Sequence, residues 1–203
     1  MSDRMQPRRI ASVVEGHGEL QAAPVLLRRL AAEIAPNTWV DFPSPYRISR
    51  NSLLVAGGIE RVVDLVVRAT TGVSGVLVLL DADDDCPAGL GPDLLARAQA
   101  TRPDVPVAVV LPNREFEAWF LAAAVSLAGY QGLAQNLEVP PNPERPRGCK
   151  EWLSKHRTDG QPYRPKSDQA GLAATFDLHL ARANSPSFDK LWRDVEYLIS
   201  GKR

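Results

Sequence analysis

The sequence predicts an α/β protein with an open, mainly parallel sheet flanked by helices. Three short apolar runs rich in Val, Ile and Leu indicate buried strands, at residues 10–14, 75–80 and 105–111. Stretches of helical length separate these runs, and such alternation is typical of a doubly wound sheet with right-handed crossovers. Acidic residues follow each run, and the carboxyl ends of parallel strands share one edge, where ligands bind.

The composition excludes several classes of protein. Lys plus Arg and Asp plus Glu number 24 each, so the 203-residue chain has no net charge to attract nucleic acid or membrane as a whole. This length fits one domain with an elaborated end. No stretch approaches about 18 apolar residues, and the basic N-terminus precedes only a short strand, so we expect neither a transmembrane helix nor a signal peptide. Cys86 and Cys149 predict no disulfide framework, and free thiols fit a reducing cytosol, so we expect a cytoplasmic protein.

The expected core runs from the first strand to residue 129. A glycine-bearing turn follows residues 10–14, and a helix then extends to about Ala35. Proline is tolerated only near the first helical turn, so Pro24 places the start of this helix close to Gln21. The remaining expected elements are, in order, a strand at 37–42, a proline-bearing loop at 43–51, a helix at 59–70, a strand at 75–80, a loop through Pro92, a helix at about 93–100, a strand at 105–111 and a helix from near Arg114 to Leu127.

The composition changes at Gly129. Residues 130–165 contain six prolines and little periodicity, apart from a possible short helix around 150–156. Ser167 is a plausible N-cap for a helix with Leu172, Phe176 and Leu180 at a spacing of four, and a last amphipathic helix spans 186–199. We therefore expect a core at 1–129, followed by a Pro-rich segment and a mainly helical extension at 130–203 that packs on it.

The acidic residues after the three strands are expected to converge on one edge of the sheet. They are Glu15 and Glu19, the run Asp81–Asp85, and Glu115 and Glu117. Two unit charges about 4 Å apart repel by roughly 4 kcal/mol at an effective dielectric constant near 20. Such a cluster must therefore bind a cation or take up protons. A hard divalent cation is the simplest way to neutralise it, and we expect Mg²⁺.

The run Asp81–Asp85 has other interpretations. An EF-hand loop is excluded because Cys86 stands where its turn needs Gly and Pro92 where it needs Glu. A haloacid-dehalogenase phosphatase motif fits poorly, because it normally follows the first strand and has Thr or Val at the place of Asp85. A solvated acidic loop remains the plain alternative.

The strand ends resemble those of a TOPRIM domain, the metal-binding module of topoisomerases, primases and OLD-family nucleases. The first strand ends in Glu15-Gly-x-x-Glu19, and the strand at 75–80 ends in Asp81-x-Asp83. The stretches 113–119 and 163–169 extend the similarity to a family of small TOPRIM-like proteins of bacteria and archaea. These proteins are often encoded beside an AAA-type ATPase of the kind implicated in phage defence. The resemblance covers about residue 8 to residue 198.

This resemblance implies a set of site residues. The implied metal ligands are Glu15, Glu19, Asp81, Asp83 and Glu117, with Glu115 as the weaker match beyond the fourth strand. Glu15 corresponds to the TOPRIM glutamate and is also a catalytic candidate. A lysine in the C-terminal part completes the site of OLD-type nucleases. Lys166 is the candidate for this lysine and Lys150 the reserve, whereas Asp85 has no firm role.

The chemistry of such a site is phosphodiester hydrolysis. Two Mg²⁺ or Mn²⁺ ions about 3.5–4 Å apart, bridged by a carboxylate such as Asp81, bind a scissile phosphate and activate water. A nearby lysine stabilises charge in the transition state. We therefore expect a metal-dependent nuclease acting on DNA or RNA, as the nuclease subunit of a two-component phage-defence system. The alternative is a non-catalytic metal-binding partner subunit of an AAA-type ATPase. A topoisomerase is excluded, because the chain is too short for a tyrosine-bearing domain and a strand gate.

Basic loop residues form a second group of candidates. Two sets could line a nucleic-acid track: Tyr46, Arg47 and Arg50, and Arg145, Arg147 and Lys150. Scattered basic residues of this kind are more commonly just solvated. The same plain interpretation applies to His17, which lies in the turn between Glu15 and Glu19.

Overall fold

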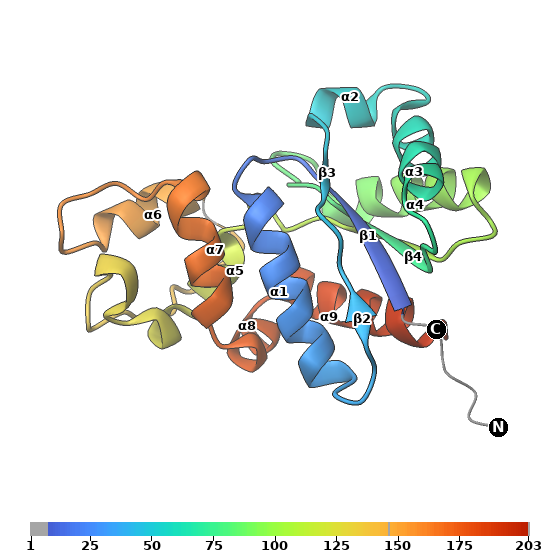
Figure 1. The fold of residues 1–203 in the computed structure, drawn as a ribbon. Helices are drawn as coiled ribbons and strands as arrows, with labels where there is room; N and C mark the ends of the chain where they lie inside the picture. Colours follow the sequence, from blue (N-terminus) through green and yellow to red (C-terminus); the bar gives the residue numbers. More distant parts are fainter. Residues whose placement is uncertain (1–7, 146, 203) are drawn as a thin grey trace.

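Five strands form an open parallel sheet in the computed structural model, which describes residues 8–145 and 147–202 (Figure 1). The strands are β1 (Arg8–Val14), β2 (Val40–Asp41), β3 (Tyr46–Arg47), β4 (Gly75–Leu79) and β5 (Val107–Val110). Their order is β2–β1–β4–β5, with β3 also paired to β1, and these neighbours all run parallel. The predicted α/β fold with a mainly parallel open sheet is therefore confirmed.

One edge of the sheet differs from the prediction. Instead of a single strand at 37–42 followed by a loop, β2 and β3 pair with opposite ends of β1, through Arg8↔Val40 and Val14↔Arg47. Val13 pairs with both β3 and β4, so β3 lies on the side of β1 away from β4. The interruption contains Pro43, which has no backbone N–H to donate to a strand ladder.

Helices cover both faces of the sheet (Figure 1). The α-helices are α1 (Glu19–Ile34), α2 (Arg50–Leu54), α3 (Gly58–Ala69), α4 (Pro87–Thr101), α5 (Ala118–Ala122), α6 (Cys149–Lys155), α7 (Pro165–Thr175), α8 (Leu178–Asn184) and α9 (Pro186–Ser200), and two 3₁₀ turns lie at η1 (Ala124–Leu127) and η2 (Tyr130–Gly132). Helices α3 and α4 cover the face of the sheet that carries Val76 and Val78. The opposite face, carrying Leu77 and Leu79, packs against α1 and α9, and the same apolar cluster continues into α5 and α7.

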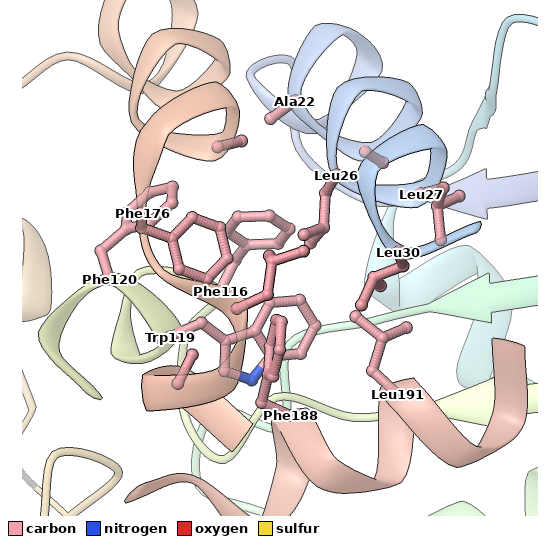
Figure 2. Packing of buried hydrophobic residues seen from close by; sticks show 14 of the residues in the cluster. Ala22, Leu26, Leu27, Leu30, Phe116, Trp119, Phe120, Phe176, Phe188 and Leu191 are labelled. Carbon is pink, nitrogen blue, oxygen red and sulfur yellow. The ribbon is translucent and has the colours of Figure 1, made fainter. Parts of the chain in front are cut away.

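An aromatic cluster joins the C-terminal helices to the sheet. Phe116, Trp119, Phe120, Phe176 and Phe188 pack with ring centroids 4.8–5.6 Å apart. Figure 2 shows these rings grouped beside the leucines of α1 and Leu191 of α9. The core on this face is thus continuous from β1 to α9, and the extension that follows residue 129 forms part of it.

Two helices begin earlier than their prolines predict. Helix α1 starts at Glu19 rather than near Gln21, and α4 starts at Pro87 rather than near residue 93. Pro24 and Pro92 each occupy the sixth position of their helix. A proline there removes one intrahelical hydrogen bond but leaves the first turn in place, and Pro87 itself favours a helix start.

The extension also differs in detail from the prediction. Helix α7 starts at Pro165 with Arg164 as its N-cap, so Ser167 is not the cap but lies inside the first turn. The expected continuation to Leu180 breaks at Phe176, and Asp177 caps the separate helix α8 by accepting from the N–H of Leu180 at 2.9 Å. The helix expected from Arg114 is reduced to α5 and η1. Within the described residues, no helix is long and apolar enough to cross a membrane.

Candidate active site

The topology places a crevice between the carboxyl ends of β1 and β4. The chain leaves β1 through α1 towards one edge of the sheet, and leaves β4 through α4 towards the other edge. These two helices also cover opposite faces of the sheet. Such a switch point is where open α/β sheets bind ligands. Glu15 directly follows β1, and Asp81 lies two residues after the end of β4.

A cavity of about 720 Å³ opens at this switch point and is called the acidic cavity below. Its lining contains most of the predicted site residues: Glu15, Glu19, Asp81, Glu117, Lys150 and Lys166. The rest of the lining is Gly16, His17, Gly18, Tyr163, Arg164, Pro165, Ser167 and Gln169. The structure therefore brings together four of the five predicted metal ligands with both candidate lysines.

Glu19 is buried in the first turn of α1 and holds the loop that precedes it. Its Oε2 accepts hydrogen bonds from the backbone N–H groups of Glu15, at 3.1 Å, and Gly16, at 3.2 Å. Burial raises the pKa of this carboxyl to about 7, and repulsion from Glu117 and Glu15 adds to the rise, whereas the two N–H groups oppose it.

Asp81 is anchored by the segment that follows β5. Its Oδ1 accepts a hydrogen bond from the backbone N–H of Phe116 at 2.9 Å, which links the end of β4 to the segment after β5. Loss of solvent around the carboxyl raises its pKa well above the ordinary value. The neighbouring carboxyls of Glu19 and Glu117 raise the pKa further.

Glu117 is only 1% exposed and is held by groups from the extension. Its Oε1 accepts a hydrogen bond from the Tyr163 hydroxyl at 3.0 Å and lies 3.5 Å from Gln169 Nε2. Its Oε2 lies 3.1 Å from the Lys150 ammonium. Burial raises the pKa of Glu117, although the Lys150 charge and the Tyr163 hydroxyl oppose the rise.

Glu15 has a carboxylate oxygen without a partner. Its Oε2 is buried and accepts no hydrogen bond from the described residues. Burial raises the pKa of Glu15, and Asp83 adds to the rise, whereas the charge of Arg50 and a hydrogen bond from the Arg50 backbone oppose it. An orphaned, negatively charged oxygen at a cavity wall is a binding position for a cation or a proton donor.

The two candidate lysines occupy different positions. Lys150 Nζ lies 2.9 Å from Glu115 Oε2 and 3.1 Å from Glu117 Oε2, between two acids, although its side chain is 39% exposed. Burial disfavours its charge, but these carboxylates outweigh burial and raise the pKa of Lys150. Lys166, in the first turn of α7, is exposed at the cavity wall and pairs with no acid among the described residues.

Asp83 lies outside the acidic cavity, unlike the other predicted ligands. It is exposed, and its Oδ2 lies 3.4 Å from Arg50 Nε. Arg50, whose side chain is 12% exposed, also donates to the carbonyl oxygens of Asp81 and Ala82 and to the carboxylate of Asp85. Arg50 was predicted only as part of a nucleic-acid track. The structure shows that it holds the acidic loop against β4.

Gly18 allows the extension to reach the cavity. A Cβ atom at this position would lie 2.1 Å from Gln169 Oε1 and 2.7 Å from the backbone oxygen of Pro165. The start of α1 can therefore approach the start of α7 only because residue 18 is glycine. Figure 1 shows the two helices side by side, and Arg29 of α1 donates to the carbonyl oxygens of Ala173 and Phe176, both at 2.8 Å.

Sequence reasoning missed Tyr163 and Gln169 as site residues. Both lie close to Lys166 in the chain, and Gln169 follows it by three positions, on the same side of a helix. With Ser167 expected as the N-cap, however, the orientation of Gln169 towards Glu117 was not predicted. The actual start at Pro165 turns Gln169 towards Glu117.

The donor set suits a hard divalent cation. Four carboxyls line one cavity, burial and the charges of neighbouring cavity carboxyls raise the pKa values of Glu19 and Asp81, and Glu15 has an unpaired oxygen. Oxygen ligands of this kind are those that Mg²⁺ and Mn²⁺ prefer. Among residues 8–145 and 147–202, no three His, Cys, Asp or Glu side chains already converge on one point in ligating geometry.

The fold and this site define a doubly wound α/β protein with an acidic cavity at its switch point. The chain belongs to the family of a domain of unknown function, DUF4276, which matches residues 14–196. That match includes every residue of the acidic cavity. Comparisons with curated proteins and with solved structures gave no significant match.

Proposed function

We propose that this protein hydrolyses phosphodiester bonds of nucleic acid with Mg²⁺ or Mn²⁺ held in the acidic cavity. The observation that carries this proposal is the convergence of Glu15, Glu19, Asp81 and Glu117 on one cavity at the sheet switch point. Within the described residues, only Glu117 among these four carboxyls has an ammonium partner, which is Lys150. Bound cations would offset the carboxyl repulsion that adds to the effect of burial on the pKa values of Glu19 and Asp81.

The roles of the protein's own groups follow from how each is held. Glu15, Asp81 and Glu117 would hold the cations, and Glu19 would do so while it keeps the loop at 15–16 in place. Bound cations would supply Lewis-acid activation of water and of the phosphate. The unpaired Oε2 of Glu15 is free to accept the proton of the attacking water. Lys166, exposed at the cavity wall, would bind a phosphate oxygen and stabilise the charge that develops there.

The resemblance to TOPRIM domains supports the same assignment. Glu15 and Asp81, which the resemblance assigns to the TOPRIM motif, line the acidic cavity. Glu19 and Glu117, which the resemblance implies as the further acids of OLD-type nucleases, line it too. Asp83, the second aspartate of the motif, faces away towards Arg50, so the proposal does not need it as a ligand.

The test is a cleavage assay on labelled single-stranded and duplex DNA and RNA and on a plasmid. We expect cleavage with Mg²⁺ or Mn²⁺ and none with EDTA. Glu15→Gln should lower the rate by at least about 100-fold. Asp85→Asn is the matched control, because Asp85 is an exposed acid paired with Arg50 outside the cavity, and it should retain most of the activity.

The same assay, with a thermal-shift measurement, identifies the alternative. A protein that Mn²⁺ stabilises but that cleaves no substrate would instead be a non-catalytic metal-binding partner of an AAA-type ATPase. The partnership with such an ATPase in phage defence rests on the TOPRIM-like resemblance. Co-purification from the native host tests it directly, since a stable partner subunit should be retained with this chain.

A further inference from the structure

A second cavity, of about 730 Å³, adjoins the acidic cavity and is called the α6 groove below. Its lining is Asp83, Asp84, Arg114, Glu115, Arg147, Gly148, Glu151, Trp152 and Lys155. The two cavities meet at Lys150. This residue lines the acidic cavity, contacts Glu115 of the α6 groove, and lies between groove residues Gly148 and Glu151 in the chain.

The groove presents cationic donors for phosphate. Arg114 Nη1 lies 3.0 Å from Asp84 Oδ1, and Arg147 contacts the same oxygen, so one carboxylate orients both guanidinium groups. Arg114 also donates through Nε to the carbonyl oxygen of Arg145 at 3.3 Å. A guanidinium has five N–H donors, so both arginines keep donors for a ligand. The negative charges of Asp83 and Glu115 are neutralised by ion pairs with Arg50 and Lys150, which lie outside the groove lining.

The groove also contains an ordered aromatic surface. Trp152 is partly exposed and stacks on His156, with ring centroids 3.8 Å apart and an interplanar angle of 26°. His156 Nδ1 lies 2.8 Å from the carbonyl oxygen of Trp152, which fixes the pair one helical turn apart. An indole beside arginine and lysine side chains is the combination that binds unpaired bases and their phosphates.

The backbone at this groove is held in an unfavourable conformation. Asp83 has φ 49° and Arg114 has φ 70°, a region that residues other than glycine seldom adopt. The two are locked together, because the N–H of Asp83 donates to the carbonyl oxygen of Arg114 at 3.0 Å and Arg114 Nη1 donates back to that of Asp83 at 3.3 Å. Strain of this kind concentrates at ligand-binding sites, and here it presents Arg114 to the groove.

We propose that the α6 groove binds an unpaired stretch of a nucleic-acid strand. One base would stack at Trp152, and backbone phosphates would contact Arg114, Arg147 and Lys155. A neighbouring phosphate of the same strand would then reach the acidic cavity past Lys150. The inference rests on the proposed function, and it makes single-stranded DNA or RNA, rather than duplex, the substrate class.

The test measures binding without cleavage, by fluorescence anisotropy of labelled 12-nucleotide DNA and RNA strands and of the matching duplexes in EDTA. Wild-type protein should bind at least one type of single strand more tightly than its duplex. Trp152→Leu should weaken that binding by on the order of tenfold, and Trp152→Phe, which keeps an aromatic ring, should restore most of it. Because Trp152 also packs against the core, thermal unfolding of each variant is measured alongside.

Arg147→Gln is the second variant, because this side chain is 73% exposed and its loss does not disturb the core. It should weaken strand binding and reduce the slope of log affinity against log salt by about 0.7, as expected for one phosphate contact. Arg68→Gln, at a side chain 76% exposed on α3, and Trp39→Leu, beside the amino end of β1, are the matched controls and should change neither quantity.

The outcomes separate the two proposals. If Arg147→Gln and folded Trp152→Leu protein both bind like wild type, or if duplex binds as tightly as single strands, the groove assignment is wrong even where the protein cleaves nucleic acid. If strand binding depends on Trp152 and Arg147 but no cleavage occurs with either metal, the groove assignment stands and the proposed hydrolysis fails.

Discussion

At the residue scale, the acids of the cavity are fixed by backbone groups as much as by side chains. Glu19 accepts from the N–H groups of Glu15 and Gly16, and Asp81 accepts from the N–H of Phe116. The Glu19 bonds hold the loop after β1 on the start of α1, and the Asp81 bond links the end of β4 to the segment after β5. The carboxyls are thus held close together despite their repulsion. Burial raises the pKa values of Glu19 and Asp81, and the neighbouring carboxyl charges raise them further.

The raised pKa of Glu19 predicts how stability depends on pH. The folded protein binds this proton up to about pH 7, whereas the unfolded chain releases it near the ordinary pKa of 4.5. The resulting stabilisation is complete below about pH 4.5 and is lost as the pH rises through about 7. For Glu19 alone it amounts to about 3 kcal/mol. Chemical denaturation in EDTA should therefore give a lower free energy of unfolding at pH 8 than at pH 5.

Glu19→Gln is the control for this pH dependence. Glutamine keeps an oxygen that can accept from the N–H groups of Glu15 and Gly16, but it does not titrate in this range. The variant should lose most of the difference between pH 5 and pH 8. A wild-type protein that is equally stable, or more stable, at pH 8 would contradict the burial of an uncompensated acid cluster.

The two lysines should give different phenotypes. Lys166→Ala should lower the cleavage rate by about 10²–10³-fold with little change in stability, because Lys166 is exposed and pairs with no described acid. Lys150→Ala leaves the buried Glu117 without its ammonium partner, and should lower the free energy of unfolding by about 1–3 kcal/mol. Cleavage kinetics and chemical denaturation of both variants check this. An exchange of the two phenotypes would make Lys150, not Lys166, the lysine that acts on the phosphate.

At the element scale, the approach of α1 to α7 builds the cavity wall. Gly18→Ala would force its Cβ against the backbone of Pro165 and the amide of Gln169. We expect this variant to lower the free energy of unfolding by about 1–3 kcal/mol. It should also weaken Mn²⁺ binding, because α7 must move away from Glu117. Denaturation and a metal titration of the same sample measure both effects.

Gly89→Ala is the matched control for this substitution. Gly89 lies in the first turn of α4, and no atom lies within 4 Å of where its Cβ would be. Alanine there should leave stability unchanged or raise it by up to about 1 kcal/mol, since alanine favours helix. Equal losses at positions 18 and 89 would mean that the close contact at Gly18 is not what holds α7 in place.

The elements that could be predicted from sequence are those with strong apolar periodicity. The strands at 75–80 and 105–111 and the helices at 59–70 and 186–199 agree with β4, β5, α3 and α9 to within about two residues. The edge strands β2 and β3 could not be predicted as two pieces, because two-residue strands carry no periodic pattern. The predicted helix starts were wrong at α1 and α4, because the prediction placed Pro24 and Pro92 near the first helical turn.

At the scale of the whole molecule, the topology accounts for most of the predicted site. Acids at the ends of parallel strands must share an edge, and this rule alone placed Glu15, Asp81 and Glu117 together. The rule could not exclude Asp83 from the predicted metal ligands. The Asp83 side chain pairs with Arg50, 33 positions earlier in the chain, and lies outside the cavity. Nor could the rule supply Tyr163 and Gln169, because their contacts depend on how the extension packs on α1.

Calorimetric titration of Mn²⁺ into wild-type protein, Asp81→Asn and Asp83→Asn tests the proposed metal centre most directly. We expect wild-type protein to bind Mn²⁺ with release of protons near neutral pH, because its raised carboxyls must ionise to bind the ion. Asp81→Asn should weaken binding by at least about tenfold, whereas Asp83→Asn should change it little, since Asp83 lies outside the acidic cavity. No Mn²⁺ binding by the wild type, or equal losses in the two variants, would contradict a cation site in the acidic cavity.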